Sequence, residues 1–161
     1  MRYMPNPVTV SIDVPQAIED VYDFLDVMAN HEPFTDHLLR DWDVSGPERG
    51  VGARARVHVR ALGVSDVVDI EVVDAETPTR IVERNTAHKA GRTGQGTYTL
   101  SPTASGGTHV AFEYRWIVTP LMDKLTAPLA RSFIRRANET SMRRLAEVLA
   151  ARARSAAPTA G

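Results

Sequence analysis

The stretch H-V-A-F-E-Y-R-W-I-V-T-P-L-M-D-K-L-T-A-P-L-A-R-S-F, residues 109–133, decides the fold because the spacing of its apolar residues changes within it. Up to Val118 every second residue is large and apolar, which is the pattern of a half-buried strand. After Pro120 large apolar residues recur every four positions, which is the spacing of a helix face. Pro128 lacks the N–H group that a helix interior needs, so we expect a short helix, a break and then one main helix.

The apolar residues after Pro120 form one stripe that we expect to lie against a sheet. Its members are Leu121, Leu125, Leu129, Phe133, Ala137, Leu145, Val148 and Leu149. From Pro128 to Ala153 the main helix would be about 39 Å long at 1.5 Å per residue. Its many arginines are predicted to form a solvated face rather than a membrane-binding one, because the apolar stripe already faces the sheet. Residues 154–161 read as a flexible tail.

The residues before this helix predict one strand, two short helices and then further strands. Residues 8–14 alternate apolar and polar side chains, whereas residues 16–28 carry apolar side chains at helical spacing. A loop and a second short helix are expected between residues 30 and 39, and turns rich in glycine and proline separate the later strands. Consecutive strands with short turns imply a meander, and the last helix is the one element long enough to cover its apolar face. We therefore predict a single α+β domain with an ordered core over about residues 8–153, in which a curved antiparallel sheet of about seven strands wraps the long C-terminal helix.

Composition and charge exclude several classes of function. The chain has 161 residues, of which 43% are hydrophobic and 24% charged, as in an ordinary globular domain. Its net charge is -1, whereas nucleic-acid binders usually carry an excess of positive charge. The absence of cysteine excludes disulfides and cysteine-based metal sites, and it suits a cytoplasmic protein. The sequence shows no secretory signal and no apolar run of membrane-spanning length, and its wealth of alanine and arginine hints at a bacterial source.

Four stretches of the chain, taken in order, carry a resemblance to a known superfamily. They are V-S-I-D-V-P-Q-A-I-E-D-V-Y-D-F-L-D-V (residues 10–27), G-P-E-R-G-V-G-A-R-A-R-V (46–57), G-G-T-H-V-A-F-E-Y (106–114) and R-R-L-A-E-V-L (143–149). The set resembles the START-like or SRPBCC superfamily, whose fold is called the helix grip, and within it the bacterial polyketide cyclase/dehydrase-like branch. One departure is Pro33-Phe34-Thr35, where that branch often has a tryptophan.

The resemblance covers nearly the whole chain, and it implies a deep cavity between the sheet and the main helix. Members of the superfamily bind lipids, sterols, polyketides or plant hormones in this cavity, and some cyclise polyketides. The branch shares no catalytic set, so no catalytic residue is carried over, and fold alone does not settle function.

Asp66 is the most unusual polar residue of the pattern. It shares strand parity with Val68 and Ile70, so it should face the apolar side, where an unpaired carboxylate is costly. It is either a functional group of the interior or a residue at the rim near Gly63 that is solvated or caps a turn.

The strand expected over residues 80–88 leaves its inner face undecided. Arg84 and His88 share one face, and Glu83 and Asn85 share the other. If the first pair points inward, Arg84 could anchor a ligand carboxylate or enolate and His88 could move a proton. The alternative is an outward arginine and a solvent-exposed histidine.

Phe112, Tyr114 and Trp116 form an aromatic stripe that suits either plain core or a cavity lining. In a cavity, the Tyr114 hydroxyl and the Trp116 N–H would be polar handles for a ligand. The candidate ligand-binding residues are thus Phe34, Asp66, Val68, Ile70, Arg84, His88, Phe112, Tyr114, Trp116 and Phe133.

Two further motifs predict no special chemistry. His31 and His37 flank acidic residues, but their spacing matches no familiar metal motif, and we expect a solvated loop and no metal. Gly91, Gly94 and Gly96 lead into a strand rather than a helix, so they read as a flexible loop at the cavity mouth rather than a phosphate cradle.

The sequence thus favours a cofactor-free protein that binds or carries a small hydrophobic molecule, such as a lipid, a polyketide or another aromatic or isoprenoid-like compound. One alternative is a cyclase, aromatase or dehydratase in which Arg84, Asp66, His88 and Tyr114 perform general acid–base chemistry. The other is an interaction module that holds a protein partner or a homodimer.

Overall fold

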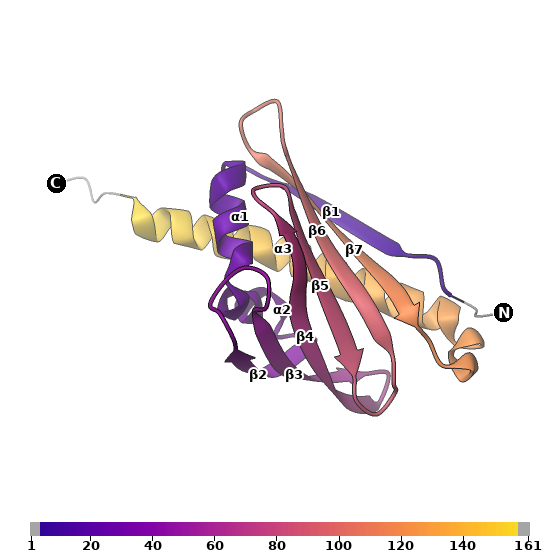
Figure 1. Cartoon of the computed structure of the whole chain (residues 1–161). Helices are drawn as coiled ribbons and strands as arrows, with labels where there is room; N and C mark the ends of the chain where they lie inside the picture. Colours follow the sequence, from indigo (N-terminus) through magenta and orange to yellow (C-terminus); the bar gives the residue numbers. More distant parts are fainter. Residues whose placement is uncertain (1–3, 158–161) are drawn as a thin grey trace.

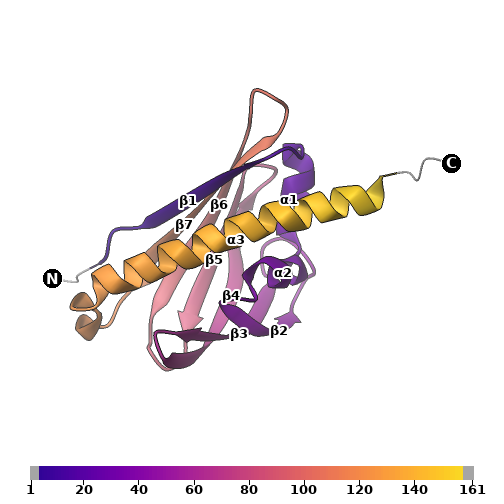
Figure 2. The same cartoon turned by 180° about the vertical axis from the view of Figure 1, so that it is seen from behind.

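Alternating apolar and polar residues build a seven-stranded antiparallel sheet, and the C-terminal stripe builds the helix that crosses it (Figures 1 and 2). The computed structural model describes residues 4–157. In chain order the elements are β1 (Val8–Val14), α1 (Ile18–Asp26), the 3-10 helix η1 (Met28–His31), α2 (Glu32–Thr35), β2 (Leu39–Ser45), β3 (Arg54–Ala61), β4 (Val64–Glu76), β5 (Arg80–Ala87), β6 (Thr93–Pro102), β7 (Thr108–Val118), the 3-10 helix η2 (Leu121–Lys124) and α3 (Ala127–Ala156). The predicted α+β helix-grip fold, with short helices after the first strand, is confirmed.

The strands follow the order β1-β7-β6-β5-β4-β3-β2, so β2 to β7 form a meander and β1 closes beside β7. Figure 2 shows α3 running diagonally across one face of the curved sheet. The helix packs chiefly against β1 on one side and α2 on the other. Arg131 Nε donates to the Asn6 carbonyl oxygen at 3.0 Å, and His37 Nε2 lies 3.0 Å from the Ala137 carbonyl oxygen. The helix therefore bridges the two edges of the sheet.

The main core lies beneath the C-terminal half of α3. Met142, Leu145 and Leu149 are buried there among inner-face residues of the strands and apolar residues of α1 and α2. Leu145 is fully buried, and so is Phe34 on α2. Burying side chains of this size stabilises the fold by roughly 1.5–3 kcal/mol each.

The N-terminal half of α3 is packed much less tightly, which corrects the prediction of one continuous buried stripe. Leu121, Leu125 and Leu129 are 76%, 84% and 58% exposed, and Phe133 is half-buried. Figure 1 shows η2 and the first turns of α3 lying past the ends of the strands, where no sheet surface covers them. Helical spacing identified the helix but not the point at which its apolar side leaves the sheet.

The expected break before the main helix is confirmed, since η2 ends at Lys124 and Pro128 lies in the first turn of α3. Two other boundaries were predicted wrongly. The helix continues to Ala156, so residues 154–156 belong to it, whereas residues 158–161 lie outside the described part of the chain. Strand β6 starts at Thr93, so Gly94 and Gly96 are strand residues rather than parts of a loop.

Candidate functional site

Strand β5 presents Glu83 and Asn85 to the interior and Arg84 to solvent. Glu83 is only 5% exposed, and an atom added at Gly96 on β6 would lie 3.7 Å from its Oε2 atom. Arg84 is exposed, and so is His88, whose Nε2 lies 2.7 Å from the Asp69 carboxylate on the outer face. The alternative with an outward arginine and a solvent histidine is therefore the one observed, and neither side chain lines the interior.

The deepest polar group of the interior is a pair formed by Glu83 and His31. His31 belongs to η1 and is 3% exposed, so the prediction of a solvated loop was wrong for this residue. Its Nδ1 atom lies 3.4 Å from Glu83 Oε1, and its Nε2 atom lies 2.7 Å from the Leu25 carbonyl oxygen. The pair thus joins the helical segment before β2 to the middle of the sheet.

The contact with Leu25 fixes where one proton of the histidine lies. A carbonyl oxygen only accepts hydrogen bonds, so Nε2 of His31 carries a proton and donates it. Nδ1 then faces the carboxyl group either as an acceptor from a protonated Glu83 or as the donor of an imidazolium beside a carboxylate. Burial raises the pKa of Glu83 above its ordinary 4.5, and the positive charge of His31 opposes that rise. One proton can therefore lie either on His31 Nδ1 or on the carboxyl group of Glu83.

Aromatic rings surround the pair. The His31 ring lies 5.4 Å from Phe34, 5.7 Å from Tyr98 in an edge-on arrangement, and 6.2 Å from Trp42. Burial raises the pKa of Tyr98 well above 10.0, and the negative charge of Glu83 adds to the rise, so its hydroxyl stays protonated. A buried ion pair with this separation adds little stability, and apolar replacements of such pairs are often neutral or stabilising.

Two polar atoms of the interior, Asn85 Oδ1 on β5 and Asn138 Nδ2 on α3, are buried without a hydrogen-bond partner. Glu83 Oε1 also forms no hydrogen bond, and its recorded polar contact is the one with His31 Nδ1 at 3.4 Å. Asn138 is 8% exposed and lies on the packed side of the helix. A buried polar atom without a partner costs about 1–3 kcal/mol, so a ligand that supplied partners would recover that free energy.

Glycines of β6 make room for the aromatic stripe of β7. A Cβ atom at Gly94 would lie 2.3 Å from the Tyr114 hydroxyl oxygen, and one at Gly96 would lie 2.8 Å from Cζ of Phe112. The Tyr114 and Trp116 rings meet edge-on with centroids 5.0 Å apart. Burial raises the pKa of Tyr114, so its hydroxyl is a neutral hydrogen-bonding group.

Asp66 turns out to cap a loop. Its carboxylate accepts backbone N–H hydrogen bonds from Val67 at 2.7 Å, from Lys89 at 2.9 Å and from Ala90 at 3.0 Å. Desolvation raises the pKa of Asp66, but these three hydrogen bonds together lower it below 3.8. The carboxylate is therefore occupied in holding the β5–β6 loop, as the turn-capping alternative proposed, and it offers no acid–base chemistry.

The other predicted site residues lie on the interior side of the fold. Phe34, Ile70, Phe112 and Trp116 are buried, whereas Val68, Tyr114 and Phe133 are half-buried. The half-buried residues lie on β4, β7 and the N-terminal half of α3, where the helix does not seal the sheet. Their role in binding stays a prediction.

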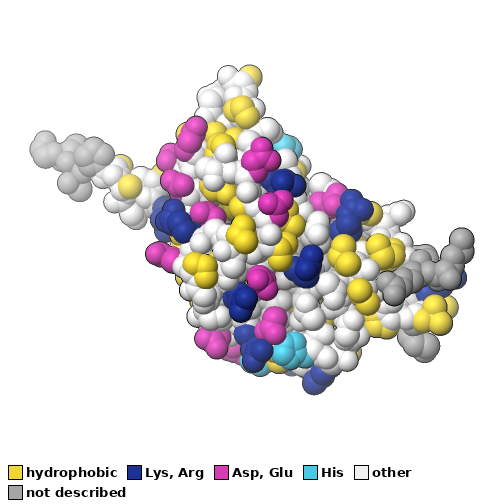
Figure 3. Space-filling model, in the orientation of Figure 1, with side chains coloured by type: hydrophobic (Ala, Val, Ile, Leu, Met, Phe, Trp, Pro, Cys, Tyr) yellow, Lys and Arg dark blue, Asp and Glu magenta, His cyan; other side chains and the backbone are white. Residues whose placement is uncertain are grey.

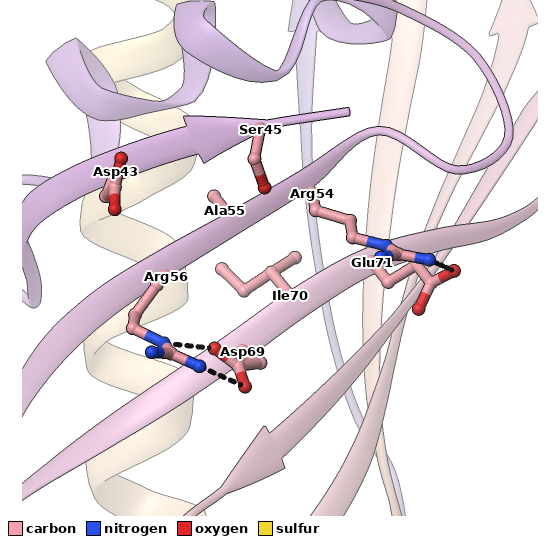
Figure 4. A pocket seen from close by; sticks show the side chains of 8 residues that line it. All are labelled: Asp43, Ser45, Arg54, Ala55, Arg56, Asp69, Ile70 and Glu71. Carbon is pink, nitrogen blue, oxygen red and sulfur yellow. Dashed lines mark hydrogen bonds and ion pairs between the residues drawn. The ribbon is translucent and has the colours of Figure 1, made fainter. Parts of the chain in front are cut away.

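Two hollows lie outside the interior. Figure 4 shows one of about 520 Å³ on the outer side of β2, β3 and β4, where Arg56 is paired with Asp69 and Arg54 with Glu71. The second, of about 1050 Å³, is an open groove between α1 and the last turns of α3. Neither lies between the sheet and the N-terminal half of α3, where the resemblance implies a deep cavity.

Residues 4–157 contain no group of three histidine or acidic side chains that could hold a metal ion. In the same residues no helix is both long and apolar enough to cross a bilayer.

Sequence reasoning missed four residues of this site. Glu83 and Asn85 form one face of their strand, but nothing in the sequence favoured that face, because the consecutive buried residues Ile81 and Val82 interrupt the alternation. His31 was predicted to lie in a solvated loop, and no pattern in the sequence singles out Asn138.

Comparisons with known proteins agree with this architecture. The family described as polyketide cyclase / dehydrase and lipid transport matches residues 7–150. No curated protein matches the sequence.

Solved structures of low sequence identity share the fold. Zhui aromatase/cyclase from Streptomyces sp. R1128 superposes with a TM-score of 0.78 at 12% identity, covering 98% of this chain and 100% of that one. TTHA0849 from Thermus thermophilus gives 0.70 at 20% identity, with 91% and 99% covered, and Ara h 8.0201 gives 0.61 at 10% identity, with 91% and 98% covered. The family match spans almost the whole described chain, and the chain therefore belongs to the polyketide cyclase / dehydrase and lipid transport family of the SRPBCC superfamily.

Proposed function

We propose that the chain binds a small, largely apolar molecule with at least one hydrogen-bonding group, between the inner face of the sheet and the N-terminal half of α3. The observation that carries the proposal is that the buried atoms Asn85 Oδ1 and Asn138 Nδ2 have no hydrogen-bond partner, and that Glu83 Oε1 has only its 3.4 Å contact with His31. A purely structural core would leave these positions apolar, because each unpaired polar atom lowers stability.

The chemistry of the interior suggests how the ligand is oriented. Aromatic and aliphatic side chains supply most of the contact surface, and the carboxyl group of Glu83 would accept a hydrogen bond from a hydroxyl or N–H of the ligand. The amide of Asn138, across the interior on α3, would pair with a carbonyl or hydroxyl oxygen. A lipid, a polyketide or another aromatic or isoprenoid-like molecule with such groups meets these requirements.

The ligand would occupy the less tightly packed half of the interior. Val68, Tyr114 and Phe133 are half-buried there, whereas the half around His31 is filled by aromatic rings. Admission of a ligand would require the part of α3 around Phe133 and Asn138 to move away from the sheet. This part of the helix contributes few buried side chains, so the movement costs little apolar contact.

Binding can be tested with N-phenyl-1-naphthylamine, a neutral aromatic probe that has one N–H donor and fluoresces in apolar surroundings. Asn85→Phe would fill the proposed site, and Arg84→Phe makes the same change on the adjacent residue that faces solvent. We expect the wild type and Arg84→Phe to bind the probe and Asn85→Phe to lose at least tenfold in affinity, with circular dichroism and thermal melting confirming that both variants fold. Equal binding by all three proteins would place the ligand elsewhere. Native mass spectrometry of the purified wild type, in search of a co-purified small molecule, would identify the natural ligand class.

The Glu83–His31 pair supports a second candidate function, which is proton transfer on a bound carbonyl compound. As a carboxylate, Glu83 could take a proton from the carbon next to a ligand carbonyl, giving an enolate and a carboxylic acid. The acid would return the proton to the product, and a proton on His31 Nδ1, 3.4 Å from Glu83 Oε1, would stabilise the carboxylate form that acts as the base. Such chemistry underlies cyclase and dehydratase reactions, and it would use Glu83 and His31 in place of the outward-facing Arg84 and His88 expected from the sequence.

This candidate is tested by solvent deuterium exchange into 1-tetralone, an apolar bicyclic ketone, followed by NMR. A catalytic pair predicts that the wild type accelerates exchange and that Glu83→Gln abolishes the acceleration while probe binding is retained. If the wild type does not accelerate the exchange, the proton-transfer function is rejected and ligand binding is the remaining proposal.

A further inference from the structure

Exposed apolar side chains gather at one end of the molecule. We call this surface the apolar end, and it comprises Leu62, Val64, Val118, Leu121, Leu125 and Leu129. Figures 1 and 2 place the β3–β4 hairpin, the β5–β6 loop and η2 at the same end, and Figure 3 shows hydrophobic side chains gathered at the edge where η2 lies. Arg92 of the β5–β6 loop is ion-paired with Asp123 of η2, with Nη2 2.7 Å from Oδ1, so these segments are in contact.

Folding does not account for these side chains. Leu125 is 84% and Leu121 is 76% exposed, although soluble proteins seldom expose neighbouring large apolar residues without a partner. The leucines lie at the helical spacing that usually buries such a stripe, yet no sheet surface lies under them.

Folding accounts even less for the exposure of Leu62, because the backbone at this residue is also strained. It forms the two-residue turn between β3 and β4 with Gly63, and its φ of 53° lies in the left-handed region that asparagine and glycine tolerate far better than leucine. The side chain is nevertheless 54% exposed. A bulky apolar residue held in an unfavourable conformation and facing solvent points to a contact outside the chain.

Basic side chains at this end outnumber the carboxylates. Asp66 accepts hydrogen bonds from three backbone N–H groups and also feels the charge of Lys89, and Asp123 is paired with Arg92. Nζ of Lys89 itself donates to the neutral carbonyl oxygen of Ser65 at 3.3 Å, and the exposed Arg60 adjoins the strained turn. Exposed leucines surrounded by lysine and arginine are the combination that binds anionic lipid surfaces.

We propose that the apolar end docks on the surface of a membrane that contains anionic lipids, with the leucines entering the headgroup layer and the basic side chains contacting lipid phosphates. The proposal goes beyond ligand binding and does not depend on it. Docking would bring the less tightly packed half of the interior, next to the first turns of α3, against the lipid.

The test is vesicle co-sedimentation of the full chain with phosphatidylcholine alone and with equal parts of phosphatidylcholine and phosphatidylglycerol. The informative variant is the double substitution Leu62→Asn and Leu125→Asn. Asparagine suits the turn at residue 62 better than leucine does, and Leu125 has little packing to lose, so the variant should melt no lower than the wild type. Val51→Asn is the matched control, because Val51 is 59% exposed in the turn between β2 and β3.

We expect the wild type and Val51→Asn to bind the anionic vesicles in a salt-sensitive manner, and the double variant to bind roughly 100-fold more weakly. Failure of the wild type to bind anionic vesicles, or equal binding by the double variant, would overturn the proposal. Sedimentation velocity provides the remaining outcome: a wild-type dimer that the double variant converts to monomers would assign the apolar end to a second copy of the chain and would also overturn membrane docking.

Discussion

Glu83 is a carboxyl group that the fold removes almost completely from water, and its ionisation should therefore affect the stability of the protein. Because burial raises its pKa in the folded state, the protonated carboxyl favours folding, and this contribution is complete below its ordinary 4.5 and is lost as the pH rises through the folded-state value. Glu83→Gln cannot ionise. We therefore predict that the free energy of unfolding of Glu83→Gln, relative to that of the wild type, increases between about pH 4 and pH 8.

Urea unfolding across this range provides the measurement, and Glu32→Gln at an exposed carboxyl of α2 is the control. A constant difference between Glu83→Gln and the wild type would mean that the carboxyl is as well solvated in the folded protein as in the unfolded chain.

At the scale of single residues, the sequence predicted which strand faces carry the apolar interior residues, but it did not predict which polar side chains are buried. Asp66 follows the inward parity of β4, yet its carboxylate is satisfied by the backbone of another loop, a contact across more than twenty positions that no local pattern contains. His31 is buried because η1 folds against the sheet, and a four-residue helix is too short to show a period. Glu83 required knowledge of the register between strands.

At the scale of elements, the two halves of α3 should differ sharply in their contribution to stability. Leu145→Ala removes a fully buried side chain and should cost about 2–5 kcal/mol, because a cavity is left among the strands. Leu129→Ala on the same helix removes a 58% exposed side chain and should change stability by less than about 0.5 kcal/mol. Chemical denaturation of both variants decides the matter, and comparable losses would show that the helix is gripped evenly along its length.

The elements themselves were largely predictable, and their limits were less so. Strand β7 and helix α3 carry long, clean periods, and both were located from them. The β4–β5 pairing shifts register between Val72 and Asp74, and Ile81 and Val82 are both buried, so the alternation that would have identified the inner face of β5 is interrupted at its start. The spacing of apolar residues identifies a helix or strand. Which face of that element points inward depends on neighbouring elements that lie far away in sequence.

At the scale of the whole molecule, the uneven packing predicts uneven dynamics. Amide hydrogens in residues 142–149 of α3 should exchange much more slowly than those in residues 127–134, because only the former lie over a filled core. If the interior binds N-phenyl-1-naphthylamine as proposed, the probe should slow exchange mainly in residues 127–138, and it should not do so in Asn85→Phe. Hydrogen–deuterium exchange followed by mass spectrometry reads both effects, and uniform protection along α3 would contradict the packing gradient.

The position of β1 between β7 and α3 has a consequence for how the protein is made. Strand β1 pairs along its length with β7, and the carbonyl oxygens of Asn6 just before it and Thr9 within it accept hydrogen bonds from arginines more than 120 positions later in the chain. Such distant contacts are slow to form, and on the ribosome they must wait until β7 and α3 have emerged. The apolar inner face of the nascent meander β2 to β7 therefore stays exposed to water until α3 has been synthesised and packs across it.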